Sequence, residues 1–221
     1  MTNYLVANPI TCLLYAYADQ IDDDLYQRWL HVLPFRLKKS IEVHVFERDR
    51  KVRLLGKILL REGLKKLMMA PSCLYKIKES NFNRPTITDY IDFNISHSAS
   101  LVACVISNES RVGLDVEQFR KFDLDPYRSC CMHNEWTRLS SSSDPCRSFI
   151  QMWTIKESIS KAEGLGLHMP MNSLNSELSS ICTKRGNNWH VKNVFLDEGY
   201  ACALSHGAPQ IHLDIVGFKL S

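Results

Sequence analysis

The stretch Arg111-Val-Gly-Leu-Asp-Val-Glu117 has the alternating pattern of a β-strand with one apolar and one polar face. Because side chains alternate along a strand, Asp115 and Glu117 project side by side, with Gly113 expected to leave open space next to them. Two like charges in that position repel unless a cation lies between them, and a hard divalent ion with oxygen ligands is a common partner. An edge strand with a solvated polar face has the same pattern. A metal site therefore needs a third ligand from elsewhere in the chain.

The segment from Phe149 to Gly164 supplies a candidate, because its apolar spacing predicts an amphipathic helix. Trp153, Glu157 and Lys161 follow at four-residue intervals and share a face, and a glycine at 164 is typical of a helix end. An ordinary exposed Glu–Lys pair, worth about 0.2–0.5 kcal/mol, has the same spacing. The helix alone therefore does not establish a site.

Three segments follow one another along the chain: Phe93-Asn-Ile-Ser-His-Ser98, Val112-Gly-Leu-Asp-Val-Glu117 and Trp153-Thr-Ile-Lys-Glu-Ser-Ile-Ser-Lys161. Their order and intervals resemble the signature of the 4'-phosphopantetheinyl transferases of the surfactin-synthetase (Sfp) type. Similarity continues through Gly164-Leu-Gly-Leu-His-Met-Pro170 and Asp197-Glu-Gly-Tyr-Ala201, so it covers nearly the whole chain. The resemblance implies an α+β fold in which two similar α/β-type subdomains form a pseudo-dimer.

A polar turn, Asn108-Glu-Ser110, is the expected boundary between two halves that each combine strands with one long amphipathic helix. The helix of the first half is expected at about residues 47–69. We expect an N-terminal subdomain over residues 1–108, which by the resemblance would contact the phosphates of coenzyme A. The C-terminal subdomain, residues 109–221, would carry the metal and catalytic residues.

The composition is typical of a soluble globular protein. Apolar residues make up 45% of the 221 residues, and the apolar run from Ile10 to Ala18 is a strand candidate that is too short to span a membrane. The opening residues lack the basic region of a signal peptide, and the eight cysteines contain no CxxC pair. We therefore expect a reduced, cytoplasmic protein without structural zinc, and we expect a monomer with neither nucleic acid nor membrane as a partner.

Positive charge is concentrated between Arg28 and Lys66, a segment that contains twelve Lys or Arg residues and only four acidic ones. Many of these cations fit the outer, solvated face of the helix. In the resembling family an arginine just before this Leu-Leu-Gly sequence contacts the 3'-phosphate of coenzyme A, which implies that role for Arg53. Arg36 and Lys39 are candidates for the same anion because they lie in the same region.

Further coenzyme contacts are implied by the resemblance alone. Asn83-Arg84-Pro85 stands where the family usually reads Gly-Lys-Pro, so Arg84 is expected to replace the lysine, although a guanidinium and an ammonium differ in geometry. Ser96 and His97, expected just before a buried strand at 101–106, would contact coenzyme phosphates. Taken alone, a histidine in such a turn is more often a structural hydrogen-bonding group.

The resemblance also implies a mechanism in which one Mg²⁺, held by Asp115, Glu117 and Glu157, grips the pyrophosphate of coenzyme A. The hydroxyl of a serine on an acyl or peptidyl carrier protein would attack the β-phosphorus, and 3',5'-ADP would leave. Glu157 or a metal-bound water would accept the serine proton, Lys161 would stabilise the leaving oxygen, and Lys156 is a candidate for a second phosphate contact. The expected carriers serve non-ribosomal peptide, siderophore or polyketide synthesis.

Two other functions fit parts of the same pattern. A magnesium-dependent phosphohydrolase can also use an Asp-x-Glu strand and a helical glutamate, and it would release phosphate without a carrier protein. A non-catalytic module that binds a carrier protein or coenzyme A would be expected to lack some of Asp115, Glu117, Glu157 and Lys161, and all four are present. The chain has no P-loop motif, so cleavage of nucleoside triphosphates by such a loop is unsupported.

Overall fold

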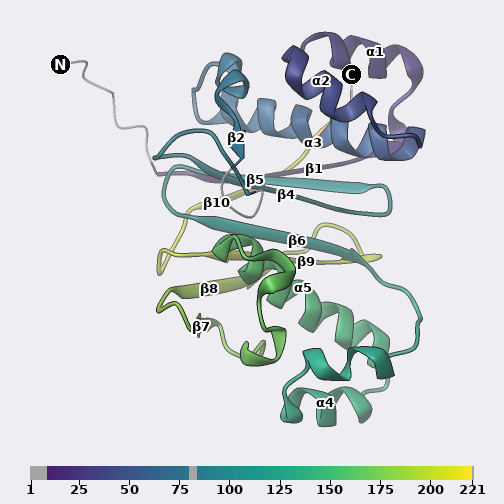
Figure 1. Cartoon of the computed structure of the whole chain (residues 1–221), viewed down its shortest axis with the longest axis vertical. Helices are drawn as coiled ribbons and strands as arrows, with labels where there is room; N and C mark the ends of the chain where they lie inside the picture. The colour runs from purple at the N-terminus through teal and green to yellow at the C-terminus, as the bar shows by residue number, and fades with distance from the viewer. Residues whose placement is uncertain (1–8, 80–83, 221) are drawn as a thin grey trace, which may run out of the picture.

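The structure, a computed structural model, describes residues 9–79 and 84–220. Two four-stranded sheets lie one above the other, and each carries a long helix on its outer face (Figure 1). This α+β architecture of two similar halves confirms the predicted fold class. Within the described ranges, no helix is both long enough and apolar enough to cross a membrane.

The first half combines a sheet with three helices that cover it (Figure 1). Its elements are β1 (Thr11–Tyr17), α1 (Asp23–His31), α2 (Phe35–Glu42), α3 (Glu47–Lys66), β2 (Lys78–Glu79), β3 (Pro85–Thr86), β4 (Asp92–Ser98) and β5 (Leu101–Ser107), with short 3-10 helices at Ala18–Gln20 and Pro71–Lys76. Helix α3 buries leucines against β5, as its apolar spacing predicts. It ends before the expected residue 69, because Met68 has a φ of 57°, outside the helical region.

The second half repeats this plan with one long helix under its sheet. Its elements are β6 (Val112–Gln118), α4 (His133–Ser140), α5 (Pro145–Glu163), β7 (Ser180–Cys182), β8 (Asn188–Asn193) and β9 (Tyr200–His206), with 3-10 helices at Asp125–Cys130, Gly166–His168 and Met171–Ser173; β10 (Leu213–Gly217) follows them in the chain. Helix α5 begins four residues earlier than expected, because the Asp144 carboxylate accepts from the Arg147 amide and Pro145 suits the first turn. It ends at Gly164, whose φ of 75° favours glycine.

The last strand departs from the expected division of the chain. β10 pairs in parallel with β1, with Thr11 opposite Leu213, so it completes the sheet of the first half, in the order β10-β1-β5-β4. The second sheet has the order β6-β9-β8-β7. The expected C-terminal subdomain, residues 109–221, is therefore corrected at its end. The physical reason is that β10 covers the edge of β1 that β5 leaves unpaired.

Two local expectations also need correction. Ser96 and His97 lie inside β4, and the turn comes after them at Ala99 and Ser100. The apolar patterns over residues 191–196 and 200–204 predict two paired strands; the second is β9, whereas the first, β8, covers residues 188–193. Asn83 lies outside the described residues.

The two sheets are joined along β4 and β6 by side chains rather than by strand pairing. Four β4 side chains at alternate positions accept hydrogen bonds from β6 amides, and the pairs are Asp92 with Val112 (2.8 Å), Asn94 with Leu114 (2.9 Å), Ser96 with Val116 (3.2 Å) and Ser98 with Gln118 (3.0 Å). Apolar residues of both sheets pack into one core beside this row. The row brings the carboxylates of β6 next to the polar end of β4.

Candidate active site

Helix α5 packs directly on the polar face of β6. A Cβ atom added to Gly113 would lie only 2.0 Å from the carbonyl oxygen of Ser158 and 2.5 Å from the amide nitrogen of Ala162. The open space expected beside Asp115 is therefore filled by the backbone of α5. This close approach brings Glu157 and Lys161 to the same place as the carboxylates of β6.

An ion pair also connects α5 with β6. Lys161 Nζ lies 2.6 Å from Asp115 Oδ1 and 2.9 Å from Ser96 Oγ, and Ser96 also donates to Asp115 Oδ1 at 3.0 Å. Asp115 is buried, and its second oxygen, Oδ2, is buried with no hydrogen-bond partner among the residues that the structure describes. A buried carboxylate oxygen without a partner is costly unless a cation or donor meets it.

The other two predicted ligands, Glu117 and Glu157, both experience the negative charge of Asp115. Burial raises the pKa of Glu117 and of Glu157, and the negative charge of Asp115 raises both pKa values further. Within residues 9–79 and 84–220, no three His, Cys, Asp or Glu side chains already stand in an arrangement that could hold a metal ion. Lys161 is the cation in contact with Asp115. The donor set of three carboxylates and the unpartnered Asp115 oxygen nevertheless fit a hard divalent cation.

His97 and Arg53 come close to this cluster. Partial removal from solvent lowers the pKa of His97, and the positive charges of Lys161 and Arg53 lower it further. The lowered pKa favours the neutral imidazole at neutral pH, and one nitrogen of a neutral imidazole can donate. Arg53 is exposed on α3, so its guanidinium is available to an anion.

Arg36 and Lys39 are exposed on α2. Arg36 lines a cavity of about 380 Å³ together with Ser40 and Lys57, and none of the predicted metal ligands lines that cavity. Lys39 Nζ lies 5.1 Å from the centre of the Phe35 ring. These two residues therefore lie at the helical layer of the first half.

The predicted coenzyme contact of Lys156 is wrong. Its side chain is completely buried, and its Nζ lies 2.5 Å from Glu135 Oε2 and 3.1 Å from the carbonyl oxygen of Cys130. Side chains of adjacent helical residues point about 100° apart, so a lysine beside Glu157 does not share its surface. Lys156 therefore holds α5 to α4 through Glu135 and to the segment before α4 through Cys130.

Arg84 also has a structural position. It is 6% exposed, forms an ion pair with Asp92, and donates to the carbonyl oxygens of Val112 and Lys161. Its guanidinium therefore joins β4, β6 and α5, and Arg84 also lines a cavity of about 510 Å³ with Asp92 and Arg111, so its coenzyme contact stays a prediction. Ser96, likewise buried, uses its hydroxyl for Asp115, the Val116 amide and Lys161, which occupies all of its hydrogen-bonding positions.

Ser98 is a residue of the site that the sequence analysis missed. Its hydroxyl donates to Glu117 Oε2 at 2.9 Å and accepts from the Gln118 amide. The signal in the sequence is the run of small polar residues at every second position from Asp92 to Ser98, which marks one face of a strand.

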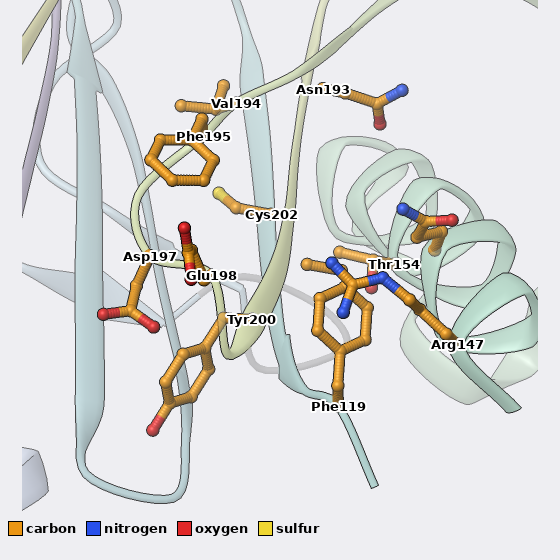
Figure 2. A pocket seen from close by; sticks show the side chains of 12 residues that line it. Phe119, Arg147, Thr154, Asn193, Val194, Phe195, Asp197, Glu198, Tyr200 and Cys202 are labelled. Atoms are coloured by element: carbon orange, nitrogen blue, oxygen red, sulfur yellow. The ribbon is translucent and has the colours of Figure 1, made fainter. Parts of the chain in front are cut away.

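A separate cavity of about 360 Å³ lies between the first half of α5 and the turn that joins β8 to β9 (Figure 2). The Arg147 guanidinium lies over the Phe119 ring at 3.7 Å, and Asp197 and Glu198 lie on the opposite side of the view. None of the predicted site residues lines it. Asp197 accepts a hydrogen bond from the Tyr17 hydroxyl at 2.6 Å, so part of this cavity wall joins the two halves.

Two family models match the chain. The model described as the 4'-phosphopantetheinyl transferase superfamily matches residues 111–213, and the model described as 4'-phosphopantetheinyl transferase, N-terminal, matches residues 22–109. Only Ser110 separates the two ranges, which together contain every residue predicted for the site.

Several curated proteins are similar to the chain. The 4'-phosphopantetheinyl transferase gsp of Aneurinibacillus migulanus is 31% identical over 157 residues, which cover 68% of this chain and 66% of that protein. The 4'-phosphopantetheinyl transferase Sfp of Bacillus subtilis is 26% identical over 172 residues, covering 73% of this chain and 76% of that protein. A Xenopus laevis protein, L-aminoadipate-semialdehyde dehydrogenase-phosphopantetheinyl transferase, is 24% identical over 187 residues, covering 73% of this chain and 59% of its own length.

Proposed function

Because the chain belongs to the 4'-phosphopantetheinyl transferase superfamily, we propose that it transfers the 4'-phosphopantetheine group of coenzyme A to a serine of a carrier protein. The observation that carries the proposal is the junction of β6 and α5, where Lys161 contacts Asp115 and where Glu117 and Glu157 share its electrostatic field. A lysine and three carboxylates at one place can serve both an anionic substrate and a cation.

Asp115, Glu117 and Glu157 are the residues that would hold Mg²⁺. The support is the unpartnered Oδ2 atom of Asp115, together with burial and the negative charge of Asp115, which both raise the pKa values of Glu117 and Glu157. A bound Mg²⁺ would neutralise charge on the phosphates of coenzyme A.

The chain's own residues would handle the protons of the reaction. Glu157 is half-buried at the junction of α5 and β6, and we propose that Glu157 or a water beside it accepts the proton of the serine hydroxyl. The serine oxygen then forms a bond to the β-phosphorus, and the bond from that phosphorus to the bridging oxygen of 3',5'-ADP breaks. Lys161 is the group that would stabilise that leaving oxygen.

Arg53 and His97 are the proposed contacts for coenzyme phosphates. The positive charges of Arg53 and Lys161 both act on the His97 ring and lower its pKa below the ordinary value, after the larger effect of burial, and Arg53 is exposed. Arg36 and Lys39 are proposed to meet the same anion from α2, where Arg36 lines a cavity with Lys57. Phosphate recognition by several cations and a neutral imidazole donor is physically reasonable.

The acceptor is proposed to be an acyl or peptidyl carrier protein, and the likeness to the surfactin type extends the proposal to carriers of non-ribosomal peptide, siderophore or polyketide synthesis. We further propose a monomer that acts in the cytoplasm. In this proposal residues 1–108 supply the coenzyme contacts, and the residues after Asn108 supply the metal ligands and the base.

The test is intact-mass spectrometry of an apo carrier protein after incubation with the protein, coenzyme A and Mg²⁺. We expect the carrier to gain the mass of one phosphopantetheinyl group, and we expect EDTA to prevent the gain. Asp115→Asn should abolish the gain, whereas Asp23→Asn, at an exposed position on α1, should leave it unchanged.

Two other results would overturn the proposal. Release of inorganic phosphate from coenzyme A without any carrier would identify a phosphohydrolase. Binding of coenzyme A or carrier with neither reaction, across several acyl and peptidyl carriers, would identify a binding module.

A further inference from the structure

Strand β4 contacts β6 through a row of side chains whose four members do not have the same partners. Each of Asp92, Asn94, Ser96 and Ser98 accepts one amide of β6. Ser96 and Ser98, at the end of the row, each donate in addition to a carboxylate of β6, Ser96 to Asp115 at 3.0 Å and Ser98 to Glu117 at 2.9 Å. Asp92 and Asn94 thus contact only the backbone of β6, whereas Ser96 and Ser98 also contact its carboxylates.

The hydroxyl of Ser98 is suited to this double contact. A serine hydroxyl has one proton and two lone pairs, and here the proton goes to Glu117 Oε2 while a lone pair accepts the Gln118 amide at 3.0 Å. The amide contact fixes where the hydroxyl stands. The donated proton then fixes one oxygen of Glu117 and leaves the other oxygen for a ligand.

Glu117 needs such a contact more than Asp115 does. Asp115 is buried and is held by both Ser96 and Lys161. Glu117 is only half-buried, and its side chain has one more rotatable bond than that of Asp115. Within the described residues, Ser98 is the hydrogen-bond donor that the structure records for Glu117. A flexible carboxylate binds a cation weakly, because its conformational freedom is lost on binding.

We propose that Ser98 is a positioning residue that orients the Glu117 carboxylate for a divalent cation. The inference rests on the proposed function for the identity of the cation site. Groups that hydrogen-bond to metal ligands commonly change metal affinity by about 10- to 100-fold when they are removed. Ser98 acts through Glu117 and touches neither substrate in this proposal.

Asn94 provides a matched control from the same row. Its Oδ1 accepts the Leu114 amide at 2.9 Å, much as Ser98 accepts the Gln118 amide, but its recorded contact is with backbone alone. A general effect of losing one contact between β4 and β6 should therefore appear equally in Asn94→Ala and Ser98→Ala. An effect on cation binding should appear in Ser98→Ala only.

The experiment is a titration of the full chain with Mn²⁺, followed by electron paramagnetic resonance of the free ion, in the presence of coenzyme A. We expect Ser98→Ala to weaken Mn²⁺ binding by about tenfold. Ser98→Thr, which keeps the hydroxyl, should restore binding to within about twofold of the wild type, and Asn94→Ala should remain within the same range while its thermal unfolding midpoint falls.

Wild-type Mn²⁺ affinity in Ser98→Ala would overturn the proposal, and so would an equal loss in Ser98→Ala and Asn94→Ala. Absence of Mn²⁺ binding in the wild-type chain would overturn it as well. If the wild type binds Mn²⁺ and Ser98→Ala weakens that binding, but no carrier gains mass, the positioning role stands and the proposed transfer fails.

Discussion

At the scale of the residue, the buried pair of Lys156 and Glu135 has the clearest energetic consequence. Both side chains are completely buried, and Glu135 also accepts from the Ser176 amide and hydroxyl and from the Met132 amide. Hydrogen bonds from Lys156 and its other donors outweigh burial and lower the pKa of Glu135, so the carboxylate is ionised at neutral pH. Removing the lysine would leave this charge without its counter-ion.

We therefore predict that Lys156→Met lowers the free energy of unfolding by about 3–5 kcal/mol, which is the usual cost of breaking a buried ion pair from one side. Denaturant unfolding measures it. The double variant Lys156→Met with Glu135→Gln should recover part of the loss. A fully stable Lys156→Met chain with a raised KM for coenzyme A would instead return Lys156 to its predicted phosphate contact.

The same residues show what the sequence could and could not reveal. The alternation around Asp115 and Glu117 correctly predicted that both lie on one face of a strand, since that period is a property of the local backbone. The partner of Lys156 lies 21 residues away and belongs to another helix, so no local pattern indicates it. Resemblance placed Arg84 at a ligand, whereas its contacts with Asp92 and the Val112 carbonyl require the tertiary structure.

At the scale of the element, the distance between α5 and β6 depends on Gly113. A methyl group there would meet the Ser158 carbonyl at 2.0 Å and the Ala162 amide at 2.5 Å, and both are backbone atoms that cannot rotate away. We predict that Gly113→Ala lowers the free energy of unfolding by at least about 1–3 kcal/mol, because overpacking must displace the helix. Carrier modification should fall with it, since the displacement separates Lys161 from Asp115.

Gly56→Ala is the matched control for this substitution. The nearest atom to the added methyl group is Ile95 Cγ2, a side-chain atom at 3.0 Å, and alanine gains about 1 kcal/mol of helix propensity over glycine. Stability of that variant should stay close to that of the wild type. Equal stability and activity of Gly113→Ala and Gly56→Ala would contradict the close packing of α5 on β6.

The pair of β8 and β9 contains a histidine that should make stability depend on pH. His206 is buried, and its Nε2 has no hydrogen-bond partner within the described structure. Its Nδ1 lies 2.7 Å from the Ala208 carbonyl oxygen. The ring of His190 stacks on it, with the ring centres 5.7 Å apart. Burial lowers the pKa of His206 below its ordinary 6.5, and nearby Lys192 and His190 lower it further, against the opposing Ala208 contact. The folded state therefore favours the neutral ring.

A lowered histidine pKa means that the unfolded chain binds more protons than the folded chain below pH 6.5, so stability is complete above that pH and is lost as pH falls through the folded pKa. We predict that His206→Asn, whose amide can still donate to Ala208, has a flatter dependence of unfolding free energy on pH between about 7 and 5. Denaturant unfolding at several pH values measures the slope. His97→Gln, which removes the other histidine with a lowered pKa, serves as the comparison, and identical slopes for wild type and His206→Asn would exclude this role of His206.

Elements were predicted better than their ends. The strands β1, β5, β6 and β9 and the helices α3 and α5 appear where apolar periodicity predicts them, because that periodicity is read directly from burial. The position of β8 differs by three residues, since its partner β9 sets its register. Ser96 and His97 were expected in a turn because both are polar. They belong to β4, whose polar side chains accept hydrogen bonds from the β6 amides.

At the scale of the whole molecule, the chain returns to its first sheet at the end. No sequence pattern indicated this, because the residues from Leu213 to Gly217 form a short strand whose partner lies some 200 residues earlier. The result is a first half whose sheet and core depend on both ends of the chain. The Thr11 amide donates to the His212 carbonyl at 2.9 Å, and the Phe218 amide donates to the Tyr15 carbonyl at 2.8 Å.

Removal of residues 211–221 should therefore destabilise the half of the molecule most distant from them in sequence. Deletion would expose the edge of β1 and would take Phe218 and Leu220 from the core, where the Phe218 ring lies 6.1 Å from that of Trp29. We predict a lower thermal unfolding midpoint together with concentration-dependent association, because an unpaired strand edge can pair with another chain. Calorimetry and size-exclusion chromatography measure the two effects.

Phe218→Ala keeps the strand and removes only the ring, so it should lower stability by at most about 3 kcal/mol without association. A truncated chain with the midpoint of the wild type would show that β10 is not part of the stable first half, and a Phe218→Ala chain that associates like the truncated one would assign that effect to the core rather than to the strand edge.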